Sequence, residues 1–356
     1  MPDNTEIDSV SYDSDWPVSA GKSMTLDPDS YSGDNNDPGN WYEAHTPYGD
    51  GDLGTPSEAN DYSTLTSWNG SADSDWTNDS NWNNGVPTSS KDVSIPPDGG
   101  ITIPSGKAAA NCNNLTIQSD ANGTGSLIIE GSLNVSGNSV IQRYIENDNS
   151  WHFLASPVLG YTIQPEFAPE ESGGTLATDF DFYYFDETAT DGYPWINLRA
   201  SDNSLNESFE SEFEVGKGYL VAYSSAYSTK HTFSGTINSG SQSINLSYTS
   251  AGGTGWNLIG NSFTASIDWS VVDKSNLEDN YFYIYDNSAN GGAGGYVYHN
   301  GSNGSGTTKF ISPGQGFFVK VASSGSIGIS ATELAHASQN YLKQEKKFDD
   351  YISDYH

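Results

Sequence analysis

Acidic side chains are the most abundant groups in this sequence that could carry out chemistry, with 46 Asp and Glu among 356 residues. A glycosidase needs two of them on facing strands, one with a raised pKa, and no spacing identifies such a pair. The sequence also has no His-Glu-x-x-His motif, phosphate-binding loop or Gly-x-Ser-x-Gly turn. We therefore expect no catalytic residues and no organic cofactor. A hydrolase with an unrecognised carboxylate pair is the least favoured function.

An oxygen-rich loop, Asp34-Asn35-Asn36-Asp37, is the best metal candidate. Calcium takes about six to eight oxygen ligands, many of them from a loop that holds a fixed path. The sequence thus suggests a weak calcium site at Asp34 and Asp37, and Asx turns are the competing interpretation of the same residues. A second loop, residues 120–125, begins like an EF-hand, but Glu130 comes one position too early to be the closing ligand. We interpret that loop as a turn.

Three closely spaced tryptophans, Trp68, Trp76 and Trp82, could form an aromatic platform for sugar rings, as in carbohydrate-binding modules. Burial in a protein core is the competing interpretation, and we favour it because large rings in a chain with few aliphatic residues are valuable core material. Exposure of the three rings on one face would support glycan binding.

The net charge of −33 excludes several classes of partner. Nucleic acids and anionic membrane surfaces require basic patches, and the sequence has only 13 Lys and Arg. No apolar run approaches the roughly 18 residues of a membrane-spanning helix, so we expect no membrane insertion. The lone cysteine, Cys112, cannot form an internal disulfide, and we expect it to be a small buried residue of a strand. We expect a monomer.

The elements that must position any site are organised around a unit that occurs twice. One copy runs from Trp151-His-Phe-Leu through an aromatic run ending at Asp186 to a Gly-x-Gly at residues 216–218. The other runs from Trp256-Asn-Leu-Ile through an aromatic run ending at Asp286 to a Gly-x-Gly at residues 314–316. Matched landmarks in one order indicate an internal duplication, with copies at about 151–235 and 256–330.

The duplication makes specific predictions about single residues. Trp151 and Trp256 should be buried, and each aromatic run should alternate between core and surface because strand side chains point to opposite faces. Gly218 and Gly316 should lie where a Cβ is unwelcome. Asp186 and Asp286 should belong to hairpin turns.

Short strands separated by Gly, Asn, Ser and Pro predict an all-β protein with several β-rich domains. We divide it into a partial immunoglobulin-like β-sandwich at 1–60, a Trp-rich β-roll or β-solenoid at 61–142 and a duplicated β-sandwich at 143–330. The final segment, 331–356, has a helix-like composition, with Leu334, Tyr341 and Phe348 spaced by seven.

Motifs in all three β-rich segments resemble those of exported proteins of Bacteroidetes. The order Asp8-x-Val-x-Tyr12, Trp16-Pro17 and Ser23-x-x-Leu26, followed by an Asp/Asn-rich loop to a Trp, resembles the C-terminal half of a lamin-tail domain. Trp68-x-Gly70, Asn81-Trp82 and Val86-Pro-Thr88 resemble the Trp-rich start of a β-solenoid of their surface proteins.

The duplicated unit carries the most specific resemblance. Trp256-Asn-Leu-Ile-Gly-Asn-Ser262, the aromatic run ending in Asp, and Phe310-Ile-Ser-Pro-Gly-Gln-Gly-Phe-Phe-Val-Lys320 resemble the paired β-sandwich region that precedes type IX secretion sorting domains. The resemblances imply a piece of a longer chain, extracellular or displayed on the bacterial cell surface. They imply a non-catalytic stalk, spacer or adhesion scaffold. The alternative is a carbohydrate-binding accessory region of a secreted glycan-degrading enzyme, with an extracellular polysaccharide or surface glycan as partner.

Overall fold

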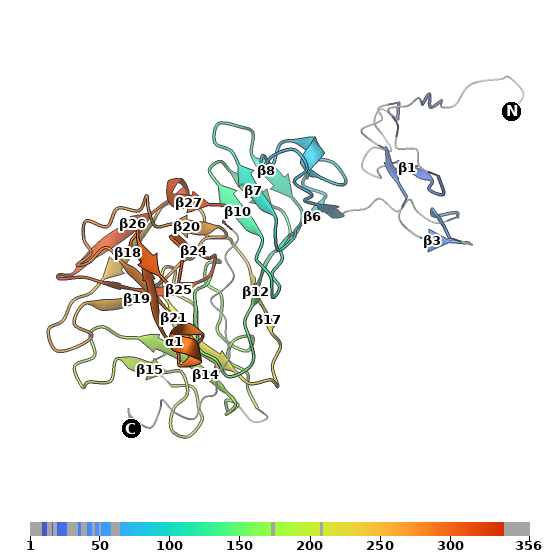
Figure 1. Ribbon diagram of the computed structural model, residues 1–356. Coiled ribbons are helices and arrows are strands. Elements are labelled where there is room, and N and C mark those ends of the chain that lie inside the picture. Colours follow the sequence, from blue (N-terminus) through green and yellow to red (C-terminus); the bar gives the residue numbers. More distant parts are fainter. Residues whose placement is uncertain are drawn as a thin grey trace, which may run out of the picture. The chain divides into compact units, whose positions relative to one another are not determined.

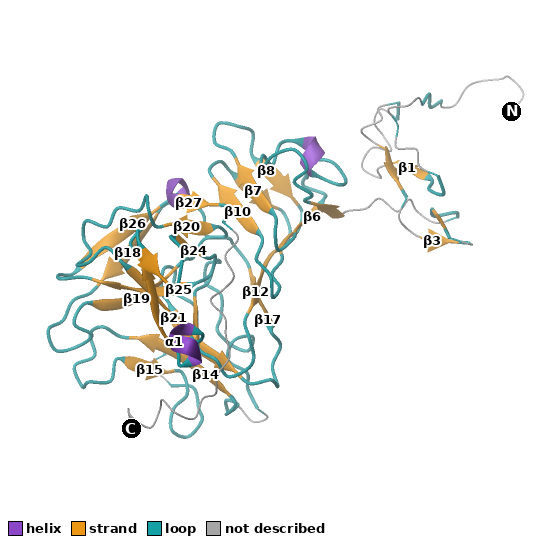
Figure 2. Ribbon diagram, viewed as in Figure 1, coloured by secondary structure: helices purple, strands orange, loops and turns teal. Residues whose placement is uncertain are grey.

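The structure is a computed structural model, and it describes residues 9–12, 16, 20–26, 35–36, 41–44, 47–49, 51–57, 65–171, 175–206 and 209–337. The chain forms two compact units, 1–66 and 67–356, which are considered separately below. Strands dominate the described residues and helices are single turns (Figures 1 and 2), so the predicted all-β class is confirmed. No helix among these residues is both long and apolar enough to cross a membrane.

The first unit contains two small antiparallel sheets. Strand β1 (Met24–Leu26) pairs with β2 (Trp41–Glu43), and β3 (Pro47–Tyr48) forms a hairpin with β4 (Asp52–Leu53). Trp16 is buried, with its ring centroid 5.6 Å from that of Trp41. Because few residues of this unit are described, the lamin-tail resemblance stays a prediction.

The second unit begins with a short β-solenoid whose rungs stack in parallel. Val93 pairs with Leu115, 22 residues later, Leu115 pairs with Ser139, and Gly100 pairs with Ser126 in the same parallel sense. Alternate residues point inward, as in Asp92–Ile95, where Val93 and Ile95 are buried. Cys112 is also buried and free, as predicted. The strands are β5 (Leu65–Ser67), β6 (Asp92–Ile95), β7 (Gly100–Ile103), β8 (Ala110–Cys112), β9 (Leu115–Ile117), β10 (Ser126–Ile129) and β11 (Leu133–Val135), with the 3₁₀ turn η3 (Asp79–Asn81) before β6.

Strand β12 (Ser139–Tyr144) belongs to the solenoid and to the duplicated region at once. It pairs in parallel with β9 and antiparallel with β17 (Lys230–Ser234), within a sheet of order β17-β12-β9-β6-β5. The predicted boundary at 142/143 therefore falls inside a strand. The duplicated unit begins earlier than Trp151, because β18 (Gln242–Leu246) pairs with β26 (Gly325–Ile329) in the second copy as β12 pairs with β17 in the first.

The central sheets of the two copies have the same strand order. In the first copy the order is β13 (His152–Leu154), β16 (Tyr219–Tyr223), β14 (Phe180–Phe185) and β15 (Trp195–Asn197). In the second it is β19 (Trp256–Gly260), β25 (Gly316–Lys320), β21 (Phe282–Asp286), β22 (Gly295–His299) and β23 (Gly304–Ser305). The register also agrees, since Tyr183 pairs with Leu220 and the equivalent Tyr283 pairs with Phe318.

The two copies contact each other through equivalent residues, as in a two-fold symmetric interface. The Ala155 amide donates to the Gly314 carbonyl at 2.8 Å, and the equivalent Gly260 amide donates to the Gly216 carbonyl at 2.8 Å. Gly216 and Gly314 both have positive φ, 77° and 66°. The first glycine of each Gly-x-Gly therefore supplies the left-handed turn.

The remaining elements close the second copy. Strand β20 (Ser266–Asp268) pairs with β24 (Phe310–Ile311) and with β27 (Leu334–Ala335), and α1 (Ala289–Gly292) is one turn in the β21–β22 connection. Residues 331–333 form the 3₁₀ turn η4 (Ala331–Glu333). The composition of 331–356 is helix-like, but residues 334 and 335 form a strand and not a helix. The reason is that the Leu334 backbone pairs with Ile267. Tyr341 and Phe348 lie outside the described residues.

Candidate functional site

The three tryptophans proposed as a glycan platform are buried, so the structure does not provide that platform. Trp68, Trp76 and Trp82 are 6%, 1% and 4% exposed, and their rings pack edge to face with Trp82 in the middle. The Trp82 indole Nε1 donates to the Trp76 carbonyl at 2.9 Å. The rings belong to the hydrophobic cluster that continues into the solenoid through Val93 and Ile95.

The proposed calcium ligands, Asp34 and Asp37, lie outside the described residues. Between them, the Asn36 side chain accepts a hydrogen bond from the Ser11 amide at 2.9 Å and donates to the Ser9 carbonyl at 3.1 Å. Within the part of the chain that the structure describes, no cluster of three His, Cys, Asp or Glu residues could hold a metal. Calcium at this loop stays a prediction.

The other acidic motifs form turns. Asp120 accepts hydrogen bonds from the Asn122 and Gly123 amides at 2.7 and 3.0 Å, as in an Asx turn. Asp186 directly follows β14 and Asp286 is the last residue of β21. Each carboxylate accepts hydrogen bonds from the amide and hydroxyl two residues later, in Thr188 and Ser288. The turn interpretations are confirmed.

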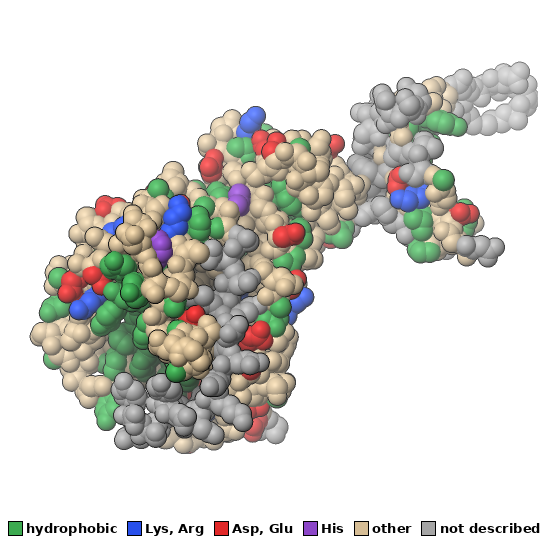
Figure 3. Space-filling view, viewed as in Figure 1, with side chains coloured by type: hydrophobic (Ala, Val, Ile, Leu, Met, Phe, Trp, Pro, Cys, Tyr) green, Lys and Arg blue, Asp and Glu red, His purple; other side chains and the backbone are tan. Residues whose placement is uncertain are grey.

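An aromatic surface on the second copy was not predicted as a site. Along β21 and β22, Phe282, Ile284 and Val297 face the core, and tyrosines occupy the alternate positions. We call this surface the tyrosine face; it consists of Trp256, Tyr281, Tyr283, Tyr285, Tyr296 and Tyr298. Tyr296 and Tyr298 are 52% and 39% exposed. Figure 3 shows hydrophobic side chains gathered over the area of β19, β21 and β25.

The ring contacts on the tyrosine face connect three strands. The Trp256 ring lies 5.1 Å from Tyr283, and the Tyr298 ring lies 5.9 Å from Tyr283 and 5.5 Å from Tyr281. The Tyr283 hydroxyl donates to Asp279 Oδ2 at 2.5 Å. Burial first, and then this hydrogen bond to a carboxylate, raises the pKa of Tyr283 well above its ordinary value. The phenol therefore stays protonated and acts as a fixed donor.

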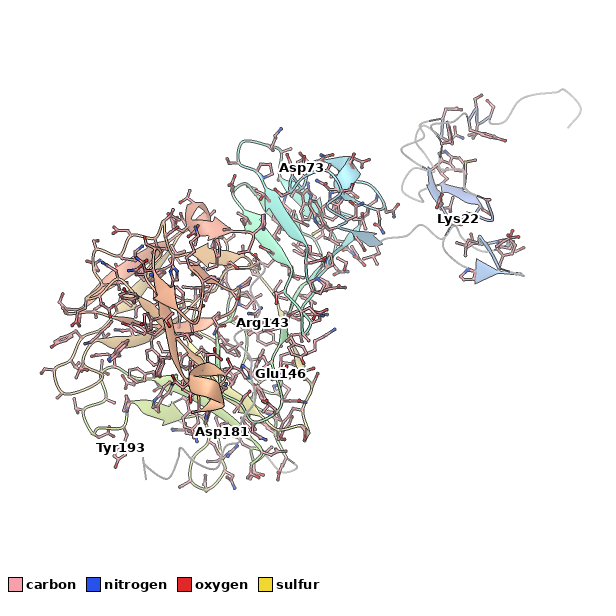
Figure 4. All side chains as sticks on the ribbon, viewed as in Figure 1. Lys22, Asp73, Arg143, Glu146, Asp181 and Tyr193 are labelled. Carbon is pink, nitrogen blue, oxygen red and sulfur yellow. The ribbon has the colours of Figure 1, made fainter. Side chains whose placement is uncertain are left out.

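The first copy has a different surface at the equivalent positions. The Trp151 ring lies 6.0 Å from Tyr183, whose hydroxyl accepts from Asn197 Nδ2 at 2.9 Å. The Tyr183 hydroxyl also lies 3.5 Å from Asp181 Oδ1, as donor, and Asp181 is labelled in Figure 4. Burial raises the pKa of the Asp181 carboxyl although the Arg199 charge opposes the rise. Burial, with the Asp181 charge, also raises the pKa of Tyr183 to about 12. A single carboxyl with a raised pKa is not the pair that glycoside hydrolysis requires.

Trp151 and Trp256 are half-buried, so the prediction of full burial is wrong for both. Each ring packs against a tyrosine, and the Trp256 ring also contacts Phe318, which packs against Phe153 of the first copy. Each ring is therefore covered only in part. The predicted alternation of the aromatic run holds through 281–286, which alternates without a break between half-buried and buried residues. In the first copy it stops after Tyr183, because Tyr184 and Phe185 are both half-buried.

A hollow of about 350 Å³ lies between the end of β10, the connection between the copies and η4. It is lined by Ile129, Glu130, Gly131, Ser239, Gly240, Ser241, Ser330, Ala331 and Thr332. Glu130 is the one carboxylate among these residues, so the hollow provides hydroxyl groups without a second acid.

Comparison with known proteins gave no match to any family model, curated protein or solved structure. The site must therefore be interpreted from its own geometry. The sequence signal that could have identified the tyrosine face is the alternation Tyr281-Phe-Tyr-Ile-Tyr285 together with Tyr296-Val-Tyr298, which places the tyrosines on one face and the aliphatic and Phe side chains on the other.

Proposed function

We propose that this chain is a non-catalytic β-scaffold, a stalk, spacer or adhesion region of a larger exported protein at the bacterial cell surface. The observation that carries the proposal is the double pairing of β12, with β9 of the solenoid and with β17 of the first copy. A strand held on both edges cannot act as a hinge without breaking its ladder hydrogen bonds. Residues 67–337 are therefore suited to a rigid spacer whose length and direction stay constant.

The continuity of the interior supports the same proposal. One hydrophobic cluster extends from Trp68 at the start of the solenoid to Ile237 at the end of the first copy. A second cluster fills the second copy and includes Phe153 of the first. The negative charge of the chain and the resemblance of its motifs to exported Bacteroidetes proteins are consistent with a soluble, displayed region.

The carbohydrate-binding alternative loses the three tryptophans on which it was based, because they are buried. One observation still favours it, on other residues: the exposed tyrosines of the second copy.

Labelling intact cells of the source bacterium with an antibody against residues 67–337 tests the proposed location. We expect labelling without lysis and loss of the signal after protease treatment of intact cells. Labelling that requires lysis would contradict surface display. Assays of the purified chain with peptide and glycan substrates test the proposed lack of catalysis. Turnover that is lost in Asp181→Asn would show the hydrolase alternative to be correct.

A further inference from the structure

We propose that the tyrosine face of the second copy is a binding site for a neutral, hydroxyl-rich polysaccharide. The proposal goes beyond the scaffold function, because a stalk or spacer needs no ligand. It rests on the exposure, polarity and charge balance of the face, and on its comparison with the first copy.

The exposure of the face is unusual for a sheet with so well packed an inner side. Phe282, Ile284 and Val297 are at most 5% exposed, whereas Tyr296 and Tyr298, on the same strand as Val297, are 52% and 39% exposed. Because residues two apart on a strand point to the same side, the two phenol rings stand next to each other. Aromatic rings carry a negative face that attracts the weakly positive C–H groups of a sugar ring.

Fixed polar groups border these rings. Asp279 holds the Tyr283 hydroxyl, and Ser305 of β23 is exposed and directly opposite Tyr298 in the sheet register. Directly opposed residues share one face of a sheet, so the Ser305 hydroxyl and the Tyr298 ring lie on the same side. A sugar stacked on Tyr298 would find hydroxyl and carboxylate groups for hydrogen bonds at the margin of the ring.

The lysine beside the tyrosine face, Lys320, is paired with a carboxylate. Lys320 Nζ lies 3.3 Å from Glu278 Oε2 and 5.6 Å from the Trp256 ring centroid. The ammonium therefore already has a carboxylate and an aromatic partner. Since the chain as a whole carries −33, a polyanionic ligand would be repelled. A neutral ligand matches this distribution of charge.

The exposed large hydrophobic residues on this face are tyrosines, without Leu, Ile, Val or Phe. The core of a protein–protein interface is usually depleted of charged residues, whereas Asp279, Glu278 and Lys320 lie beside these rings. A phenol offers a stacking surface and a hydroxyl together, which matches a ligand that alternates C–H faces with hydroxyl groups. The face thus fits a glycan better than a protein.

The first copy serves as an internal comparison. Tyr183 pairs with Asn197 across the strands, and the equivalent Tyr283 pairs with Tyr298. Asp181 occupies the position of Tyr281. The Asn197 amide is already bonded to the Tyr183 hydroxyl. The first copy keeps an aromatic residue at three of these positions, with Tyr183 at that of Tyr283, Phe185 at that of Tyr285 and Trp195 at that of Tyr296. The pair of exposed tyrosines, Tyr296 and Tyr298, is a feature of the second copy.

Affinity electrophoresis of the intact chain through gels with β-1,3-glucan, β-1,4-glucan, xylan, mannan or starch tests the proposal, with polygalacturonate as the anionic comparison. We expect retardation by at least one neutral polysaccharide and none by polygalacturonate. Calorimetry with that polysaccharide should show at least tenfold weaker binding for the double variant Tyr296→Ala/Tyr298→Ala. Tyr298→Phe, which keeps the ring, should bind the polysaccharide no more than about threefold more weakly than the wild type.

The matched control is Tyr193→Ala, since Tyr193 is 59% exposed but belongs to the β14–β15 connection of the first copy (Figure 4) and not to the tyrosine face. It should bind like the wild type. Thermal unfolding of each variant shows whether a loss of binding reflects loss of folding, and Tyr298→Phe provides a second measurement if the double variant unfolds. The proposal would be overturned if none of the neutral polysaccharides retards the chain or if polygalacturonate retards it more strongly. It would also be overturned if Tyr193→Ala loses as much affinity as the double variant.

Discussion

Glu187 and Asn287 occupy equivalent positions, each directly after the aspartate that closes an aromatic run, and the side chain of each contacts the other copy. Glu187 Oε1 accepts hydrogen bonds from the Thr249 and Gly255 amides at 2.7 and 2.9 Å, next to Trp256. Asn287 Nδ2 donates to the Trp151 carbonyl at 3.0 Å. Each copy thus fixes the segment that leads into the central sheet of the other with one buried side chain, although the two side chains differ in charge and in hydrogen-bonding role.

The first prediction concerns this reciprocal contact. Glu187→Ala should lower the free energy of unfolding by about 2–4 kcal/mol, because it leaves two backbone amides without the carboxylate that accepts their hydrogen bonds. Asn287→Ala should cost less, about 1–2 kcal/mol, because one hydrogen bond is lost. Denaturant unfolding measures both. Tyr193→Ala, at an exposed position, should stay within about 0.5 kcal/mol of the wild type. If Glu187→Ala and Asn287→Ala both left the free energy of unfolding nearly unchanged, the contact would not hold the copies together.

The second prediction concerns the second glycine of each Gly-x-Gly. A Cβ at Gly218 would lie 2.6 Å from the Ile259 carbonyl oxygen and 2.7 Å from Leu258 Cγ, whereas one at Gly316 would lie 3.0 Å from Phe153 Cβ. Gly218→Ala should therefore destabilise by about 1–3 kcal/mol, and Gly316→Ala by less. The cause is close approach of the other copy, since neither residue has positive φ.

Gly328 on β26 is the matched control for these substitutions, because a Cβ there would meet nothing within 4 Å. Gly328→Ala should leave the thermal midpoint nearly unchanged. A larger decrease in the thermal midpoint for Gly328→Ala than for Gly218→Ala would contradict the geometric explanation.

The duplicated architecture could be predicted from the sequence because its landmarks are local. Each aromatic run and each Gly-x-Gly is contained in a few consecutive residues, and their common order determines a common strand order. The role of β12 could not be predicted in this way. Residues 139–144 resemble one more short strand, and their partner β17 lies about 90 residues later in the chain. Pairing over such a distance leaves no local pattern.

The tyrosine face illustrates a second limit. Alternation along Tyr281–Asp286 predicts two faces, but it does not show whether the second face is covered by another part of the chain. The same uncertainty explains the error for Trp151 and Trp256, which are large and apolar yet only half-buried. Conversely, Trp68, Trp76 and Trp82 are buried because they pack against one another in the core cluster of the solenoid, which is formed by residues distant in sequence.

The third prediction concerns the Asp34–Asp37 loop. Calorimetric titration with calcium should show at most weak binding, with a dissociation constant of about 0.1 mM or higher. Asp34→Asn/Asp37→Asn should remove the heat of binding, and Asp120→Asn should not, because the Asp120 carboxylate is used in a turn. A dissociation constant below about 1 μM would show a preformed calcium site that the turn interpretation misses.

The fourth prediction tests whether the tryptophan cluster belongs to the protein core or forms a glycan-binding platform. Trp76→Ala should destabilise the chain by about 3–5 kcal/mol, since the ring is 1% exposed and its removal leaves a cavity beside Trp82. Denaturant unfolding measures this cost. At a temperature where the variant is folded, affinity for any polysaccharide retained by the wild type should be unchanged. Loss of affinity without loss of stability would restore the tryptophans as a glycan platform.

The last prediction is a pH dependence that arises from Glu166. Its Oε1 accepts the Thr232 amide at 3.0 Å and lies 3.6 Å from His231 Nδ1, and the His231 ring is stacked between Phe167 and Tyr223. Burial alone would raise the pKa of Glu166, but the nearby His231 imidazole and the Thr232 amide outweigh burial and hold the pKa below its ordinary value of 4.5.

A carboxyl whose pKa is lower in the folded than in the unfolded state binds fewer protons when folded, so its contribution to stability is complete above the unfolded pKa. That contribution is lost as the pH falls through the lower, folded pKa. The difference in unfolding free energy between the wild type and Glu166→Gln should therefore be largest above about pH 5 and should shrink as the pH falls toward about 3. Thr162→Ser, on the same segment, controls for general acid sensitivity and should follow the wild-type pH profile. A difference that grows on acidification would show that burial, and not hydrogen bonding, dominates the environment of this carboxyl.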